Sequence, residues 1–178
     1  MKKTVIFTVL LCIVALSCAY AGKASLVAQV SPYSLQTVPV SGETYVSTYG
    51  FGAKGGFRYD VYKGLNVGFD VDFGVYRFKE LDSDYNILSA RALVGYRYDF
   101  STSLFAQAEL GVALEMRNTA EARARSVGMN LYLGCGHGLG DRLAVTVGTD
   151  VGMEFQKGNG GVVTGFALRT QVGALMTL

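Results

Sequence analysis

The sequence predicts an all-β fold, an eight-stranded antiparallel up-and-down transmembrane β-barrel, and two observations lead to it. Apolar residues alternate with other residues at a period of two in eight segments, which is the pattern of strands and not of helices. In the second to eighth segments the apolar face carries no charge, whereas the opposite face is rich in glycine and bears charges of both signs. A barrel with its apolar face toward lipid accounts for both observations.

Eight strands are predicted in chain order from this alternation. Their ranges are 26–30, 49–59, 65–75, 88–98, 104–116, 127–135, 143–155 and 166–176. The third is the clearest, because its odd positions are all Leu, Val or Phe and its even positions are Asn, Gly and Asp. The weakest stretch is 106–125, where Ala, Glu, Arg and Met make a helix the alternative. Seven consecutive apolar alternations favour a strand there.

The connections between the strands alternate in character. Tight turns are predicted at 60–64, 99–103 and 137–142, and polar loops at 31–45, 79–86, 118–125 and 156–161. Both prolines, Pro32 and Pro39, fall in the first loop, where we expect no ladder hydrogen bond to be lost. Aromatic residues cluster near both sets of connections and predict two interfacial girdles, one with Phe57, Tyr59, Tyr62, Tyr96, Tyr98 and Phe100 and one with Tyr45, Tyr49, Tyr76, Phe78, Tyr85 and Phe155.

The polar face decides between a membrane barrel and a soluble one. A soluble sandwich or lipocalin-like barrel, the alternative, would need a polar face rich in Lys and Glu, but this face is mostly Gly, Ser, Asn and Gln. It also carries five cations and six anions, namely Lys54, Arg58, Arg91, Arg97, Arg169, Asp70, Asp72, Glu109, Glu115, Asp150 and Glu154. Because eight strands leave an interior just wide enough for side chains, we expect these charges to form a salt-bridge network that fills the lumen. A charged conducting path is the alternative.

The first 21 residues have the three parts of a secretory signal peptide. Lys2 and Lys3 precede an apolar run at 5–16, and Ala19 and Ala21 form an A-x-A cleavage site. We therefore predict a signal peptide at 1–21 and a single barrel domain at 22–178. An uncleaved anchor and lipidation of Cys18 are the alternatives.

Charge and residue counts exclude several functions. The chain without 1–21 has 14 basic and 14 acidic residues, so it lacks the excess of cations that nucleic acid binding requires. Its single histidine, His137, excludes multi-histidine metal sites, and its single cysteine, Cys135, cannot form an internal disulfide. Gly50 to Gly55 match the G-x-G-x-x-G pattern of dinucleotide sites, but the alternation continues past them where such a site needs a helix. We expect no metal, no cofactor and no enzymatic activity.

Taken together, these residues resemble the small eight-stranded outer-membrane barrels, the superfamily of the OmpA barrel domain, OmpX/Ail and OmpW. The resemblance covers residues 22–178 and is one of architecture, without a diagnostic motif. It implies export through the Sec pathway to the outer membrane of a diderm bacterium, insertion by the barrel-assembly machinery, periplasmic termini and turns, and extracellular loops. The chain departs from the family at Leu178, where these barrels commonly end in an aromatic residue.

The predicted function is that of a closed structural or surface-interaction barrel. Its partners would be outer-membrane lipid and host or surface ligands met by the loops, and a monomer is expected because a closed barrel has no free edge. The alternative is a narrow OmpW-like conduit for small hydrophobic molecules. A conduit needs an apolar lining, for which the sequence offers Tyr76, Leu93, Phe105, Tyr132 and Leu175.

Overall fold

The computed structural model describes residues 24–40, 43–79, 83–118, 123–158 and 161–178. The predicted signal peptide, with Cys18 and the cleavage residues Ala19 and Ala21, lies outside the described residues. The described residues form nine strands: β1 (Ala24–Val40), β2 (Glu43–Val46), β3 (Tyr49–Tyr62), β4 (Leu65–Phe78), β5 (Ser83–Asp99), β6 (Leu104–Asn118), β7 (Arg123–Gly138), β8 (Leu143–Gly158) and β9 (Gly161–Thr177).

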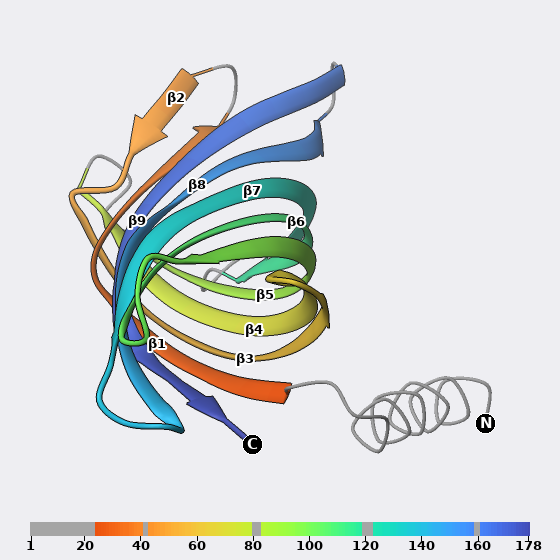
Figure 1. Cartoon of the computed structure of the whole chain (residues 1–178). Helices are drawn as coiled ribbons and strands as arrows, with labels where there is room; N and C mark the ends of the chain where they lie inside the picture. Colours follow the sequence, from red (N-terminus) through yellow and green to blue (C-terminus); the bar gives the residue numbers. More distant parts are fainter. Residues whose placement is uncertain (1–23, 41–42, 80–82, 119–122, 159–160) are drawn as a thin grey trace, which may run out of the picture.

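Eight of these strands close into a barrel. Each of β3 to β8 pairs antiparallel with the next strand along the chain, and β1 pairs with both β3 and β9, so the sheet has no open edge between β1 and β9 (Figure 1). The predicted fold class is confirmed. A helix at 106–125 is wrong, because β6 continues to Asn118 and β7 begins at Arg123. Within the described ranges no helix has the length and hydropathy to cross a membrane.

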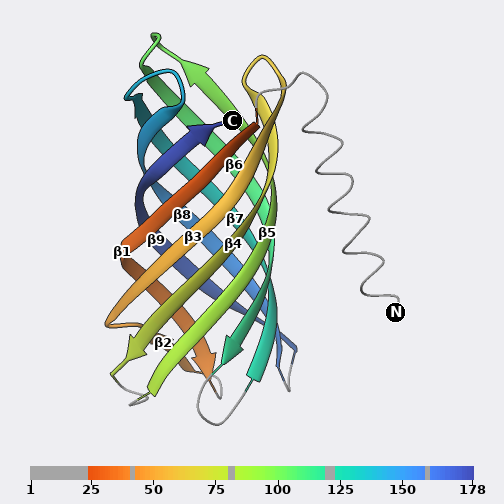
Figure 2. The ribbon, with the colours of Figure 1, turned by 90° about the horizontal axis from the view of Figure 1, so that it is seen from below.

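The turns and both described ends of the chain lie at one end of the barrel, which we call the turn end (Figure 2). There the backbone N–H of Leu178 donates to the carbonyl of Ala24 at 2.8 Å. The β3–β4 turn is reduced to Lys63 and Gly64, whose φ angles of 39° and 87° fit a two-residue hairpin turn with the twist of the flanking strands. The opposite end is the loop end.

The strands at the loop end are longer than predicted and the loops correspondingly shorter. Cross-strand pairing continues to Phe78↔Ser83, Asn118↔Arg123 and Gly158↔Gly161, so part of each predicted loop at 79–86, 118–125 and 156–161 belongs to strands. The physical reason is that apolar alternation is required only where a strand faces lipid, whereas backbone pairing continues into polar sequence.

The predicted loop at 31–45 is also wrong, because β1 runs through it to Val40 and forms a hairpin with β2. Pro32 sits at the irregularity between Val30 and Tyr33, where the register with β9 shifts. Pro39 pairs with Thr44 of β2, and it lies beyond Gln36, the last β1 residue that pairs with β9. Both prolines therefore occupy positions where a missing N–H is tolerated, a bulge and a strand edge.

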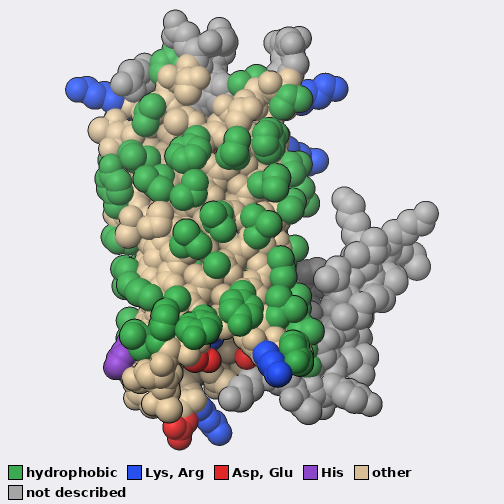
Figure 3. All heavy atoms as spheres, turned by 45° about the horizontal axis from the view of Figure 1, so that its top comes forward, with side chains coloured by type: hydrophobic (Ala, Val, Ile, Leu, Met, Phe, Trp, Pro, Cys, Tyr) green, Lys and Arg blue, Asp and Glu red, His purple; other side chains and the backbone are tan. Residues whose placement is uncertain are grey.

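The outer wall of the barrel is a band of exposed apolar side chains. Leu, Val, Phe and Met residues from every barrel strand are exposed, and Val71 at the middle of β4 is 46% exposed. On the face shown in Figure 3 the charged side chains gather at the two ends of this band. An apolar outside and a polar inside are the reverse of a soluble barrel, as lipid requires.

Candidate functional site

The lumen receives the side chains that alternate with the apolar outer face. Ten of the eleven predicted lumen charges are buried, and the structure brings them into connected groups. Arg97 is the exception, since its side chain is 32% exposed near the turn end. Its Nε donates to Asp99 Oδ1 at 2.7 Å and its guanidinium lies 3.8 Å from the centre of the Phe105 ring, so it is apart from the buried groups.

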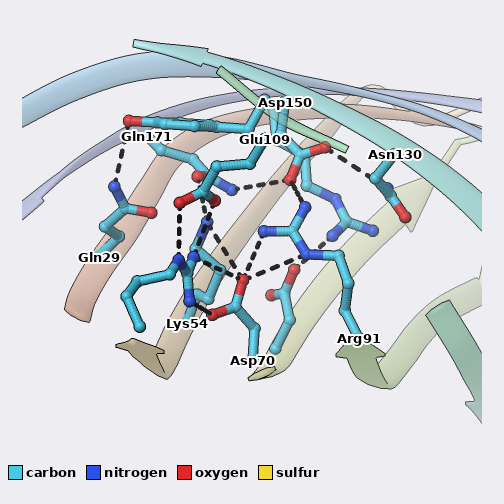
Figure 4. A network of polar contacts seen from close by, with 12 residues as sticks. Gln29, Lys54, Asp70, Arg91, Glu109, Asn130, Asp150 and Gln171 are labelled. Carbon is cyan, nitrogen blue, oxygen red and sulfur yellow. Dashed lines mark hydrogen bonds and ion pairs between the residues drawn. The ribbon is translucent and has the colours of Figure 1, made fainter. Parts of the chain in front are cut away.

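Five charged side chains form a continuous chain of ion pairs across the middle of the barrel, and we call Arg58, Asp70, Arg91, Glu109 and Asp150 the lumen network (Figure 4). Arg58 donates to both carboxylates beside it, to Glu109 Oε1 at 2.6 Å through Nε and to Asp70 Oδ1 at 2.6 Å through Nη1. Arg91 donates to Asp70 Oδ2 at 2.5 Å and to Asp150 Oδ2 at 2.7 Å. These residues come from β3, β4, β5, β6 and β8, so the network ties non-adjacent strands together.

Lys54 extends the lumen network toward β7 and β9. Its Nζ donates to Gln171 Oε1 at 2.7 Å, lies 3.9 Å from Asp70 Oδ2 and sits 4.9 Å from the centre of the Tyr132 ring. Gln29 of β1 donates to the Tyr132 hydroxyl at 3.2 Å. The wall of the barrel is therefore linked across its interior by polar contacts on every side.

The geometry explains how so many charges remain buried. Taking an ion out of water costs several kcal/mol unless opposite charges and hydrogen bonds compensate. Asp70, with no exposed surface, receives hydrogen bonds from Arg58 and Arg91, and Arg58 engages both of its carboxylates with two nitrogens each. Such forked contacts are the strongest that guanidinium forms with carboxylate.

A second group of charges lies closer to the loop end. Arg117 pairs with Glu154 and lies 3.8 Å from Glu115, and the Gln36 amide donates to Glu154 Oε1 at 2.5 Å. Asp72 pairs with Arg169. The predicted lumen set omits Arg117, although it has the same parity as Glu115, because the predicted strand stopped at Met116. Reading the alternation one step further would have found it.

An aromatic cluster occupies the lumen at the loop end, above the charges. Tyr76, Phe78 and Ile87 are buried there, and Tyr45 and Tyr85 pack against them. The rings of Phe78 and Tyr85 meet edge to face with centres 4.9 Å apart. The predicted loop-end girdle is therefore wrong for Tyr76 and Phe78, which share the inward parity of Asp70 and Asp72. It is also wrong for Tyr85, which pairs with Tyr76 across the strands and packs against the same cluster.

The turn end of the lumen is open by comparison. A cavity of about 1170 Å³ lies among the turns, lined by polar and charged residues that include Arg97, Asn66 and Gln107. Arg58 and Glu109 of the lumen network form part of its lining. The lumen thus has a wide polar mouth at one end, ion pairs across its middle and packed rings at the other end.

The remaining candidate residues lie elsewhere. His137 and the free thiol of Cys135 are exposed on the outer wall near the turn end of β7. Gly50 to Gly55 lie inside β3, so they do not precede a helix as a dinucleotide site requires. Over the described residues, no group of three or more His, Cys, Asp or Glu side chains is arranged to hold a metal ion.

Comparison with solved structures places this architecture among known proteins. The chain superposes on Neisserial surface protein A with a TM-score of 0.64 at 12% identity, covering 88% of this chain and 97% of that one. It also matches Ail of Yersinia pestis, solved with the heparin analogue sucrose octasulfate, with a TM-score of 0.51 at 13% identity, covering 87% and 99%. The N-terminal barrel of Pseudomonas aeruginosa OprF gives 0.51 at 12% identity, covering 88% and 99%.

Neither a family model nor a curated protein matches the sequence. The shared property is thus the fold, and the chain has the fold of the small eight-stranded outer-membrane β-barrels, as the sequence predicts.

Proposed function

We propose that the protein is a closed, non-conducting barrel of the outer membrane that presents its loop end at the cell surface. The lumen network is the observation that carries this proposal. Its five side chains are at least nine-tenths buried and connect strands on opposite sides of the barrel, so an ion crossing the lumen would have to break several charge-assisted hydrogen bonds.

The aromatic cluster supports the same conclusion at the loop end. Phe78 and Tyr76 are 0% and 1% exposed, and Tyr45 of β2 packs against them from the β1–β2 hairpin. A path that passed the lumen network would still meet packed rings. The barrel therefore serves as a rigid support, and recognition falls to the connections at its loop end, with host or surface molecules as the ligand class.

The fold supports the remaining parts of the proposal. Transmembrane barrels of the outer membrane have short turns in the periplasm, so the turn end would face the periplasm. Sec export and insertion by the barrel-assembly machinery belong to the same proposal. A monomer suffices because β1 and β9 close the sheet. We propose no enzymatic activity, since the sole histidine, His137, is exposed on the outer wall whereas the carboxylates of the lumen are buried inside the barrel.

A conduit for small hydrophobic molecules is the competing function, and the placement of its lining residues argues against it. Tyr132 faces Lys54, Phe105 lies under Arg97, and Tyr76 belongs to the aromatic cluster. Charged side chains thus interrupt the apolar residues that would have to line a continuous path.

Planar-bilayer conductance of the refolded protein tests the proposal. The sample is first checked for heat-modifiable gel migration, which reports an intact barrel. We expect no steady conductance from the wild type and openings from a double variant, Asp70→Ala with Arg91→Ala, that removes the centre of the lumen network. Stable wild-type channels, or uptake of fatty compounds by vesicles that contain the wild type, would overturn the closed-barrel proposal.

A further inference from the structure

Two exposed cations stand side by side on the outer wall at the loop end. Ser126 of β7 pairs with Gln156 of β8, so one residue further toward the loop end Arg125 lies beside Lys157. Both side chains are exposed, and neither forms an ion pair or hydrogen bond with any residue in the described part of the chain. Like charges on neighbouring strands repel, so this arrangement is unfavourable unless an anion lies between them.

Exposed apolar residues flank the two cations on the same row. Across β6 to β9 the register places Met116 beside Arg125 and Val162 beside Lys157, and both apolar side chains are exposed. A hollow of about 290 Å³, lined by Met116, Asn118, Ala124 and Arg125, opens next to the cations. The cations therefore have room for a group larger than a bare ion.

The rows toward the middle of the barrel are wholly apolar over β6, β7 and β8. Leu114, Val127 and Phe155 lie side by side in the first row, and all three are exposed. The second row contains Val112, Met129 and Met153, again exposed. A molecule that places an anionic group at Arg125 and Lys157 can thus lay hydrocarbon along the wall below them.

Another exposed cation at the loop end, Arg77, does not share this arrangement. Arg77 at the loop end of β4 pairs with Asp84 at 3.3 Å, which satisfies its charge. On the face drawn in Figure 3, Lys and Arg side chains appear at the loop end, and side chains of both charge signs appear at the turn end.

We propose that Arg125 and Lys157 bind the phosphate of a phosphorylated lipid in the membrane leaflet at the loop end, with its acyl chains against the apolar rows of β6 to β8. Arginine and lysine side chains at a membrane surface hold phosphate through charge-assisted hydrogen bonds, and each contributes to retention of anionic lipid. This site rests on the proposed insertion in a membrane and adds a specific lipid to it.

Native mass spectrometry of the detergent-solubilised protein tests the site with defined lipids. The probes are bis-phosphorylated lipid A, the same lipid after removal of its phosphates, and phosphatidylcholine. We expect the wild type to retain the phosphorylated lipid in preference to the other two. The double variant Arg125→Gln with Lys157→Gln should bind it about 30-fold more weakly, because two interfacial cations are lost.

A matched control removes two exposed cations at the turn end, by Lys63→Asn and Arg142→Gln. It has the same net charge as the loop-end variant and should bind the phosphorylated lipid like the wild type. Equal loss in both double variants, equal binding of the phosphorylated and dephosphorylated lipids, or displacement of the lipid by equimolar inorganic phosphate would overturn the site.

Heat-modifiable migration of every variant is recorded on the same samples. A barrel that is intact but shows no lipid preference contradicts the lipid site alone. A protein that does not form a heat-modifiable barrel contradicts the proposed function itself.

Discussion

Asp70 and Val71 are neighbours on β4, yet their side chains lie in opposite environments. Asp70 points into the lumen, is completely buried and binds Arg58 and Arg91, whereas Val71 points outward and is 46% exposed. Inside, a charge is stable because partners surround it; outside, a charge has only lipid to meet. One residue along a strand therefore separates a place that requires ion pairs from a place that forbids them.

The two walls also differ in how they use glycine. Gly148 lies inside, where an added Cβ would come within 2.5 Å of the Tyr132 hydroxyl, while a Cβ on Gly55 would meet nothing within 4 Å. The inner wall is thus packed against its own large side chains. On the outer wall there is room for larger side chains, so a substitution there is limited by polarity and not by size.

Removing the buried carboxylate of Asp70 should lower the free energy of unfolding more than any other substitution considered. Asp70→Ala leaves Arg58 and Arg91 buried without their shared carboxylate, so we expect the free energy of unfolding to fall by about 3–5 kcal/mol. Urea unfolding in lipid vesicles, followed by circular dichroism and heat-modifiable migration, measures it. A loss below about 1 kcal/mol would show that Asp70 is not held as the structure describes.

Placing a charge on the lipid-facing outer wall should give the second-largest loss in the free energy of unfolding. Val71→Arg puts a guanidinium at the middle of the lipid-facing band, which costs about 2–4 kcal/mol in the same unfolding assay. Val71→Leu is the control and should unfold like the wild type. If arginine were tolerated as well as leucine in vesicles, this face would not meet hydrocarbon.

A glycine-to-alanine substitution should lower the free energy of unfolding more on the inner wall than on the outer wall. Gly148→Ala forces the Tyr132 ring to move, and we expect a loss of about 1–3 kcal/mol. Gly55→Ala, its matched control, should change stability little. A comparison of urea midpoints decides the point, and equal midpoints for the two variants would contradict the packing of Tyr132 against β7 and β8.

Breaking the exposed ion pair at the loop end should change the free energy of unfolding least. Asp84→Ala breaks the contact with Arg77, in which both side chains are about half exposed, and removes at most about 1 kcal/mol. The effect should vanish in high salt, because water and ions screen exposed charges. An effect as large as that of Asp70→Ala would mean that burial does not set the strength of these pairs.

The alternation predicts the strands and the direction of their side chains, because one face of each strand had to be apolar. It predicts the inward orientation of Asp70, Arg91 and Asp150 without any knowledge of their partners. Which charges meet cannot be read from one strand, since Arg91 and Asp150 are brought together only by barrel closure.

The prediction fails where lipid no longer constrains the sequence. Arg117 and Gln36 lie at the loop end, beyond the apolar band, so periodicity ends there while the ladder continues. The sequence does not predict the β1–β2 hairpin for the same reason, and the prolines near it favour a loop. The girdle prediction is wrong for Tyr76, Phe78 and Tyr85 because it rests on aromatic composition, whereas parity alone places Tyr76 among the lumen-lining residues.

The ladder between β1 and β9 has a consequence for folding kinetics. Every other ladder of the barrel joins consecutive strands or joins β1 to β3, which only the short β2 separates along the chain. This one joins Ser25 to Thr177, near the two ends of the described chain. Its loop-closure entropy is the largest in the molecule, and contacts of that sequence separation form slowly. Pairing of β1 with β9 should therefore be the last step of folding, after the hairpins from β3 to β9 have formed. Until that step, water can still reach the cations of the inner wall.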